Sequence, residues 1–99
     1  MDEKKLDNLL LMYGNDELRW SVLFVDVRQE RVEPLVTFLE ACGFVTTAVL
    51  RDPDSDALFF VQVSETRTHD AASLRARTLE MEECARAHDA AVADWSAKR

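Results

Sequence analysis

The residues of this chain whose types could do chemistry are an acidic turn, two histidines and two cysteines. Asp52, Asp54 and Asp56 alternate along the chain, as the first ligands of a calcium-binding loop do. Such a loop also needs a glycine and a closing glutamate, but Ala57 and Val63 stand at those two positions. The pattern therefore favours a solvated acidic turn over a calcium site.

The histidines and cysteines lack the spacing of metal ligands or of a nucleophile with its base. His69 is expected in a loop before a helix and His88 at a helix end, and neither is placed to share a metal with Cys42 or Cys84. The cysteines form no Cys-x-x-Cys motif, so two reduced, buried thiols are expected, with a disulfide across the core as the alternative. We therefore predict no metal, no cofactor and no catalytic residues.

The charge balance excludes one class of partner and favours another. The 99 residues include 19 acidic and 12 basic side chains, and the net charge is −7. Nucleic-acid backbones bind clustered Lys and Arg, so direct nucleic-acid binding is not expected, whereas a basic protein would be attracted. The alternative is that the acidity only keeps the protein soluble.

Length and hydropathy predict a single domain over residues 1–99. No segment approaches the ~20 consecutive apolar residues that a membrane span needs. The stretch Met1–Lys5 lacks the basic-then-apolar order of a signal peptide. A cytoplasmic protein without membrane contacts is therefore expected.

Two strands are expected at the centre of the fold. The stretch Ala57–Ser64 is the most apolar in the chain, and both of its alternating rows of side chains are largely apolar. The stretch Leu18–Val27 has the same property. A strand that is apolar on both faces belongs inside a sheet, so neither stretch is expected at a sheet edge.

The remaining elements alternate with these two strands. Apolar residues at helical spacing predict helices, and short runs rich in β-branched residues predict strands. The first predictions are a helix over Asp2–Tyr13 that ends at Gly14 and a polar connector over Arg28–Arg31. A second helix is predicted over Glu33–Cys42, with Pro34 in its first turn and Gly43 as its cap, and it is followed by a strand over Phe44–Arg51 and the turn Asp52–Asp56. After a polar crossing over Glu65–His69, we predict a long helix that Thr68 or Asp70 caps and that runs to about Asp89, and then a strand over Ala90–Lys98.

After the helix in residues 1–14, residues 18–99 follow the order βαββαβ. Right-handed crossovers satisfy this order as a ferredoxin-like α+β sandwich, with a four-stranded antiparallel sheet of order 4-1-3-2. The two strands that are apolar on both faces are then the middle pair. Helices would cover one face of the sheet, and either the N-terminal helix or a second copy of the chain would have to cover the other.

Two groups of residues are candidates for a protein-binding surface, and the acidic turn adds to them. Trp20 and Trp95 fall on neighbouring strands, and a partly exposed tryptophan pair beside Asp94 would suit a binding hot spot; the alternative is that both tryptophans pack in the core. Glu80 and Glu83 lie in an acidic stretch of the long helix. This stretch is either a solvated face or a surface that attracts a basic partner.

The C-terminal half of the chain resembles a known family. The residues that carry the resemblance are Leu74, Met81, Cys84-Ala85, His88 and Val92-Ala93-Asp94-Trp95, together with the segment Leu39–Phe44. They resemble the regulators of ribonuclease activity B, small acidic bacterial inhibitors of ribonuclease E with an acidic N-terminal helix before βαββαβ. Trp95 matches the last residue of the family's Tyr-Asp-Gly-Trp, whereas the three residues before it depart from that motif. The family's acidic tail has no counterpart before Arg99.

The resemblance implies a non-catalytic protein that binds and modulates a ribonuclease or its basic scaffold region. Binding of this kind would be salt-sensitive and would occur without turnover. The alternative comes from a different class, a small-molecule-sensing module, because ferredoxin-like domains often dimerise and bind ligands at the seam. That alternative predicts an apolar pocket with a few convergent polar groups.

Overall fold

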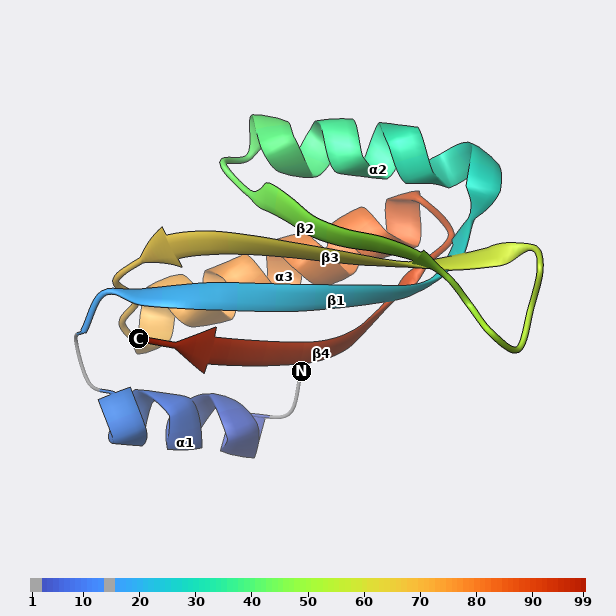
Figure 1. Cartoon of the computed structure of the whole chain (residues 1–99). Helices are drawn as coiled ribbons and strands as arrows, with labels where there is room; N and C mark the ends of the chain where they lie inside the picture. The colour runs from blue at the N-terminus through green and yellow to red at the C-terminus, as the bar shows by residue number, and fades with distance from the viewer. Residues whose placement is uncertain (1–2, 14–15) are drawn as a thin grey trace.

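The computed structural model describes residues 3–13 and 16–99 of the chain (Figure 1). The elements in this part are α1 (Glu3–Tyr13), β1 (Leu18–Arg28), α2 (Gln29–Ala41), β2 (Val45–Arg51), β3 (Leu58–Arg67), α3 (Ala71–Ala87) and β4 (Ala91–Lys98). Two predictions, the start of the first helix at Asp2 and its end at Gly14, lie outside the described residues.

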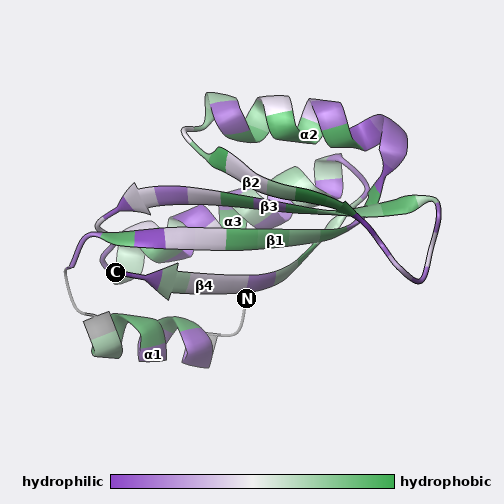
Figure 2. Ribbon diagram, viewed as in Figure 1, coloured by the Kyte–Doolittle hydropathy of each residue, from purple (hydrophilic) through white to green (hydrophobic). Residues whose placement is uncertain are grey.

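The four strands form one antiparallel sheet in the order β2-β3-β1-β4. This is the predicted order 4-1-3-2 counted from the other edge, and the predicted α+β fold with an added N-terminal helix is confirmed (Figure 1). The strands β1 and β3 are the central pair, in agreement with the apolar side chains on both of their faces. Figure 2 shows their apolar stretches side by side.

One face of the sheet forms the core of the protein. Val22 of β1 lies opposite Val63 of β3 and Trp95 of β4, so the three side chains point to the same face. All three are buried in one cluster with Leu39 of α2 and Met81 of α3. The helices α2 and α3 therefore cover this face, and α3 runs behind the sheet in Figure 1.

No helix in the described part of the chain lies over the other face of the sheet (Figure 1). The side chain of Leu23, which points to this face, is only half-buried. The helix α1, one of the two candidates for covering this face, lies instead along the β4 edge. Leu6 of α1 joins the core cluster, and Lys5 forms an ion pair with Asp94 of β4.

The helix α2 begins four residues earlier than predicted, at Gln29 and not at Glu33. The strand β1 continues through a bulge, where Asp26 has a φ of 58°, as far as Arg28, and α2 follows it directly without the predicted polar connector. Pro34 consequently lies inside α2 and not in its first turn. Gly43, with a φ of 97°, follows the end of α2 and confirms the predicted cap.

The strand β3 begins one residue later than predicted and ends three residues later, because Glu65, Thr66 and Arg67 belong to it and not to a polar crossing. Glu65 continues the inward-facing row of Val61 and Val63 and is buried like them. The side chain of Asp70 accepts a hydrogen bond from the backbone N–H of Ser73, whose hydroxyl accepts one from the Asp70 N–H. This capping box selects Asp70 as the cap of α3.

The two edges of the sheet differ in what covers them. The β4 edge is flanked by α1 (Figure 1), and β4 is confirmed as a strand. The strand β2 has no neighbour on its outer side in the described part of the chain, and it exposes three large apolar side chains. These are Val45, Val49 and Leu50.

Candidate functional site

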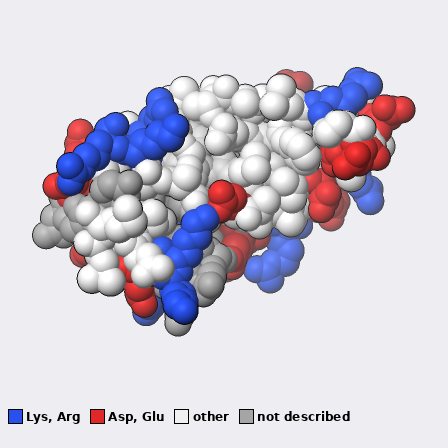
Figure 3. All heavy atoms as spheres, turned by 60° about the horizontal axis from the view of Figure 1, so that its bottom comes forward, with Lys and Arg blue, Asp and Glu red and all other residues white. Residues whose placement is uncertain are grey.

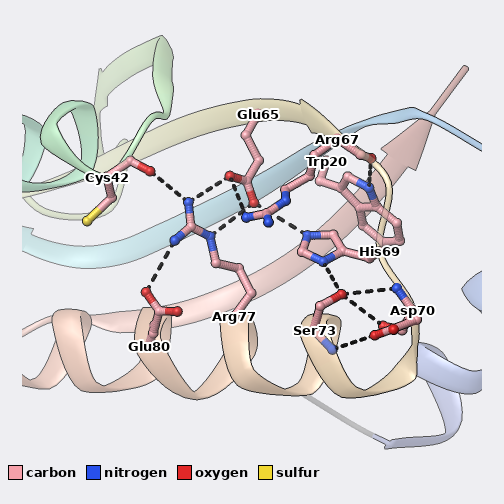
Figure 4. A network of polar contacts seen from close by, with 9 residues as sticks. All are labelled: Trp20, Cys42, Glu65, Arg67, His69, Asp70, Ser73, Arg77 and Glu80. Carbon is pink, nitrogen blue, oxygen red and sulfur yellow. Dashed lines mark hydrogen bonds and ion pairs between the residues drawn. The ribbon is translucent and has the colours of Figure 1, made fainter.

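The most polar cluster inside the molecule centres on an ion pair between β3 and α3 (Figure 4). The Nε atom of Arg77 donates to Oε1 of Glu65 over 3.0 Å, and Nη2 donates to Oε2 over 2.7 Å. Both side chains are nearly buried. The geometry is bidentate, the strongest form of a guanidinium–carboxylate pair.

Arg77 also ties this pair to the end of α2. Its Nη2 donates to the backbone carbonyl of Cys42 over 2.8 Å, and its Nη1 donates to Glu80 over 3.2 Å. Its guanidinium lies 4.5 Å from the centre of the Phe44 ring. Burial alone would lower the pKa of Arg77, but hydrogen bonds and the charge of Glu65, followed by Glu80, raise it overall. Arg77 thus joins α3, β3 and the α2–β2 turn as a permanent cation.

His69 extends the cluster toward the start of α3 (Figure 4). Its Nδ1 lies 2.9 Å from the hydroxyl of Ser73, and its ring meets that of Trp20 edge-on at 5.2 Å. Its Nε2 lies 3.5 Å from Glu65 and makes no hydrogen bond. Burial, and then the positive charge of Arg67, lowers the pKa of His69, and Glu65 only partly opposes this. The imidazole is therefore neutral at neutral pH.

This cluster is suited to holding elements together and not to catalysis. The side chain of His69 has no exposed surface, and those of Glu65 and Arg77 have 7% and 10%. A general acid or base must come within hydrogen-bond reach of a substrate, which these buried groups cannot do without opening the core.

Cys84 and His88 are the other pair whose types suggest chemistry. The Sγ of Cys84 lies 3.9 Å from Nδ1 of His88, but that nitrogen lies closer, at 2.8 Å, to the backbone carbonyl of Cys84. Burial, with a smaller effect of the nearby Cys42, raises the pKa of Cys84 to about 11. The thiol is therefore protonated at neutral pH and is not a nucleophile.

Both cysteines are free thiols, in agreement with the prediction of reduced cysteines. Cys84 is buried as predicted, but Cys42 is only half-buried, because it lies at the exposed end of α2. Among the described residues there is no group of three or more His, Cys, Asp or Glu side chains that could hold a metal ion.

The tryptophan hot spot is wrong as a surface feature. Trp20 and Trp95 are each 1% exposed. They point to the same face of the sheet, where Trp20 lies opposite Ala97 and Trp95 lies opposite Val22. This is the helix-covered face, so packing in the core, which was the alternative, accounts for both residues.

The predicted acidic residues do not form one site. Asp94 of β4 pairs with Lys5 of α1, and Glu80 of α3 pairs with Arg77. Glu83 is exposed on α3, on a different element from the acidic turn.

The acidic turn between β2 and β3 is the candidate that stays at the surface as a group. The backbone N–H of Asp54 donates to Oδ1 of Asp52 over 2.8 Å, the expected hydrogen bond of an Asx turn. Asp54 and Asp56 are exposed, and Asp52 is half-buried. In Figure 3 acidic atoms gather at the right-hand end of the molecule, where Figure 1 places this turn.

A shallow groove runs beside α2 where the end of α3 meets it. Its volume is about 690 Å³, and seven of its lining residues come from one face of α2 while the eighth is His88. Phe38, which is 47% exposed, lines it with Pro34, Glu30 and Glu33.

Sequence reasoning missed Glu65 and Arg77 as core residues, and it placed His69 in a loop without a partner. One signal was present for each of the missed pair: Glu65 follows Val61 and Val63 at strand spacing, and Arg77 falls between Leu74 and Met81 at helical spacing. Because both residues are charged, they were expected at the surface in spite of that spacing. A charged side chain is expected in the core only where an oppositely charged partner is known to lie beside it.

Comparisons with known proteins do not assign a family. No protein-family model matches the sequence, and no curated protein matches it.

None of the described helices is both long and apolar enough to cross a membrane.

Proposed function

We propose that this protein is a non-catalytic regulator that acts by binding another protein, and that its target is a ribonuclease or the basic scaffold region of one. The resemblance to regulators of ribonuclease activity B suggests ribonuclease E as the first target to test. The proposal places the protein in the cytoplasm, without cofactor and without direct contact to nucleic acid.

One observation carries the proposal: exposed large apolar side chains stand beside exposed carboxylates. Leu50 is 59% exposed and lies two residues before Asp52, where the acidic turn begins. Phe38 is exposed in the groove that also holds Glu30 and Glu33. Apolar anchors with a charged rim are typical of protein-binding surfaces, and negative charge favours a basic partner.

The buried position of the reactive groups supports the same proposal. Glu65, His69 and Arg77 are enclosed in the core, and the Cys84 thiol is protonated. The groups that remain at the surface are suited to contact with another molecule and not to a chemical step.

The experiment that tests the proposal has two stages. Tagged protein is first used to capture partners from a bacterial lysate, and enriched proteins are identified by mass spectrometry against an unrelated acidic protein of equal net charge. Purified ribonuclease E is then assayed for RNA cleavage with and without the protein. We expect enrichment of a basic partner, slower cleavage, and binding that weakens as salt rises from 50 to 300 mM.

The control in the cleavage assay is RNA alone with the protein, where we expect no binding and no turnover. If no protein is enriched above the charge-matched control and ribonuclease E cleaves at an unchanged rate, the proposal is wrong.

A further inference from the structure

The groove beside α2 has features that the core of the protein does not require. The helix buries Leu35 and Leu39, with Val32 and Val36 packed against the same core. The groove-lining residues recur at the same helical spacing on the outer side, from Gln29 to Ala41. At 1.5 Å per residue this stripe is about 18 Å long, the length of about twelve residues of a partner helix.

The charges in the groove are all of one sign. Among the described residues that line it, Glu30 and Glu33 are acidic and none is Lys or Arg. The nearest basic residue of α2, Arg31, is engaged by Asp89 over 3.2 Å. A carboxylate in the first turn of a helix is favoured by the helix dipole, which accounts for Glu30 alone. Glu33 lies in the second turn, and the dipole gives it no comparable support.

The lining of the groove also contains an aromatic contact. The rings of Phe38 and His88 lie with their centres 6.1 Å apart. Phe38 is about half exposed and is not part of the core cluster, so packing of the core does not account for this aromatic residue. Pro34, which also lines the groove, has no N–H to donate to the backbone carbonyl of Glu30. That carbonyl belongs to a residue that lines the groove.

We infer that this groove binds a basic segment of a partner polypeptide, with an apolar side chain against Phe38 and with Lys or Arg side chains at Glu30 and Glu33. Charge complementarity selects this occupant, because the lining offers two carboxylates to a basic segment and offers no Lys or Arg to an acidic one. The inference rests on the proposed function and names the surface and the partner chemistry.

The first test uses a defined probe. A blocked twelve-residue peptide with leucine and arginine at helical spacing is titrated into ¹⁵N-labelled protein, and amide shifts are followed by NMR; a second peptide carries glutamate in place of each arginine. We expect shifts concentrated on α2 and His88 with the basic peptide only. Shifts confined to the acidic turn or to the open sheet face, or equal binding of the acidic peptide, would overturn the inference.

The second test uses variants of the exposed groove residues. We expect Glu30→Lys with Glu33→Lys to weaken binding of the basic peptide at least tenfold, and Phe38→Ala to weaken it about fivefold. Glu17→Lys makes this charge change once, at an exposed site in the connector before β1, and we expect less than a twofold effect. Dispersed NMR spectra check that each variant is folded. Equal losses in the groove variants and in Glu17→Lys would show a general charge effect and would overturn the inference.

The same variants separate this inference from the proposed function. If the wild-type protein captures a partner and the groove variants capture it equally well, the groove assignment is wrong and the regulatory function stands. If the basic peptide binds in the groove but no cellular protein is enriched, the groove assignment stands and the regulatory function is wrong.

Discussion

Replacing Arg77 by Met tests the claim that one buried ion pair joins the two helices to the sheet. The substitution keeps a long apolar side chain but removes four hydrogen bonds, two to Glu65, one to the Cys42 carbonyl and one to Glu80. Glu65 is 8% exposed and would remain as a buried carboxylate without its main partner. Removing one member of a buried ion pair costs about 3–5 kcal/mol.

That cost is large for a domain of this size. Domains of this kind have free energies of unfolding of about 5–15 kcal/mol. For about 100 residues, a loss of this size lowers Tm by roughly 15–30 °C. The bond from Arg77 to Glu80 adds little to this sum, because the Glu80 side chain is 55% exposed and the pair is screened by water.

The assay is urea unfolding followed by circular dichroism, with Arg86→Met as the matched control. Arg86 is exposed on the same helix, so we expect its loss to cost less than about 1 kcal/mol. The double variant Glu65→Leu with Arg77→Met removes both charges, and we expect it to recover at least half of the loss. A loss below about 1 kcal/mol for Arg77→Met, or a double variant as unstable as the two single losses combined, would refute this reasoning.

Three further predictions follow from the burial of single side chains. The pKa of His69 is below its ordinary value of 6.5, so the unfolded chain takes up a proton first as pH falls. The free energy of unfolding should therefore decrease below about pH 6.5, and urea titrations at pH 7.5 and 5.5 should show a smaller decrease for His69→Gln. Because the pKa of Cys84 is about 11 and Cys42 is half-buried, a thiol reagent at pH 8 should label Cys42 first in the native protein; equal rates would contradict this. Leu6→Ala should cost about 2–4 kcal/mol and speed amide exchange in α1, whereas unchanged exchange would mean that Leu6 does not hold α1 in place.

The strands and the order of elements could be predicted from the sequence because their signals are local. Strands β1 and β3 each carry apolar side chains on both faces, and a strand of that kind is expected between two neighbours and not at an edge, although helices cover only one face of this sheet. Gly43 could be placed as a cap for a similar reason, since the left-handed conformation after a helix favours glycine.

The exposure of the candidate protein-binding residues could be predicted only in part. The acidic turn was correctly expected at the surface, because Pro and alternating Asp specify a turn wherever they occur. The tryptophans were placed on the right strands, but their exposure depends on the helices that cover them, and nothing local to Trp20 or Trp95 encodes it. The groove beside α2 also depends on two elements, because His88 reaches it only through the packing of α3.

The sequence by itself determined which segments are strands and helices, their order, and the pairing of the two central strands. Spacing and backbone preference act over a few residues, and they suffice for this. Only the tertiary structure decided that Glu65 and Arg77 are buried together and that α1 flanks β4 and leaves one sheet face open. A buried charge is tolerated only opposite its partner, and Arg77 meets Glu65 and the Cys42 carbonyl only once the chain has folded.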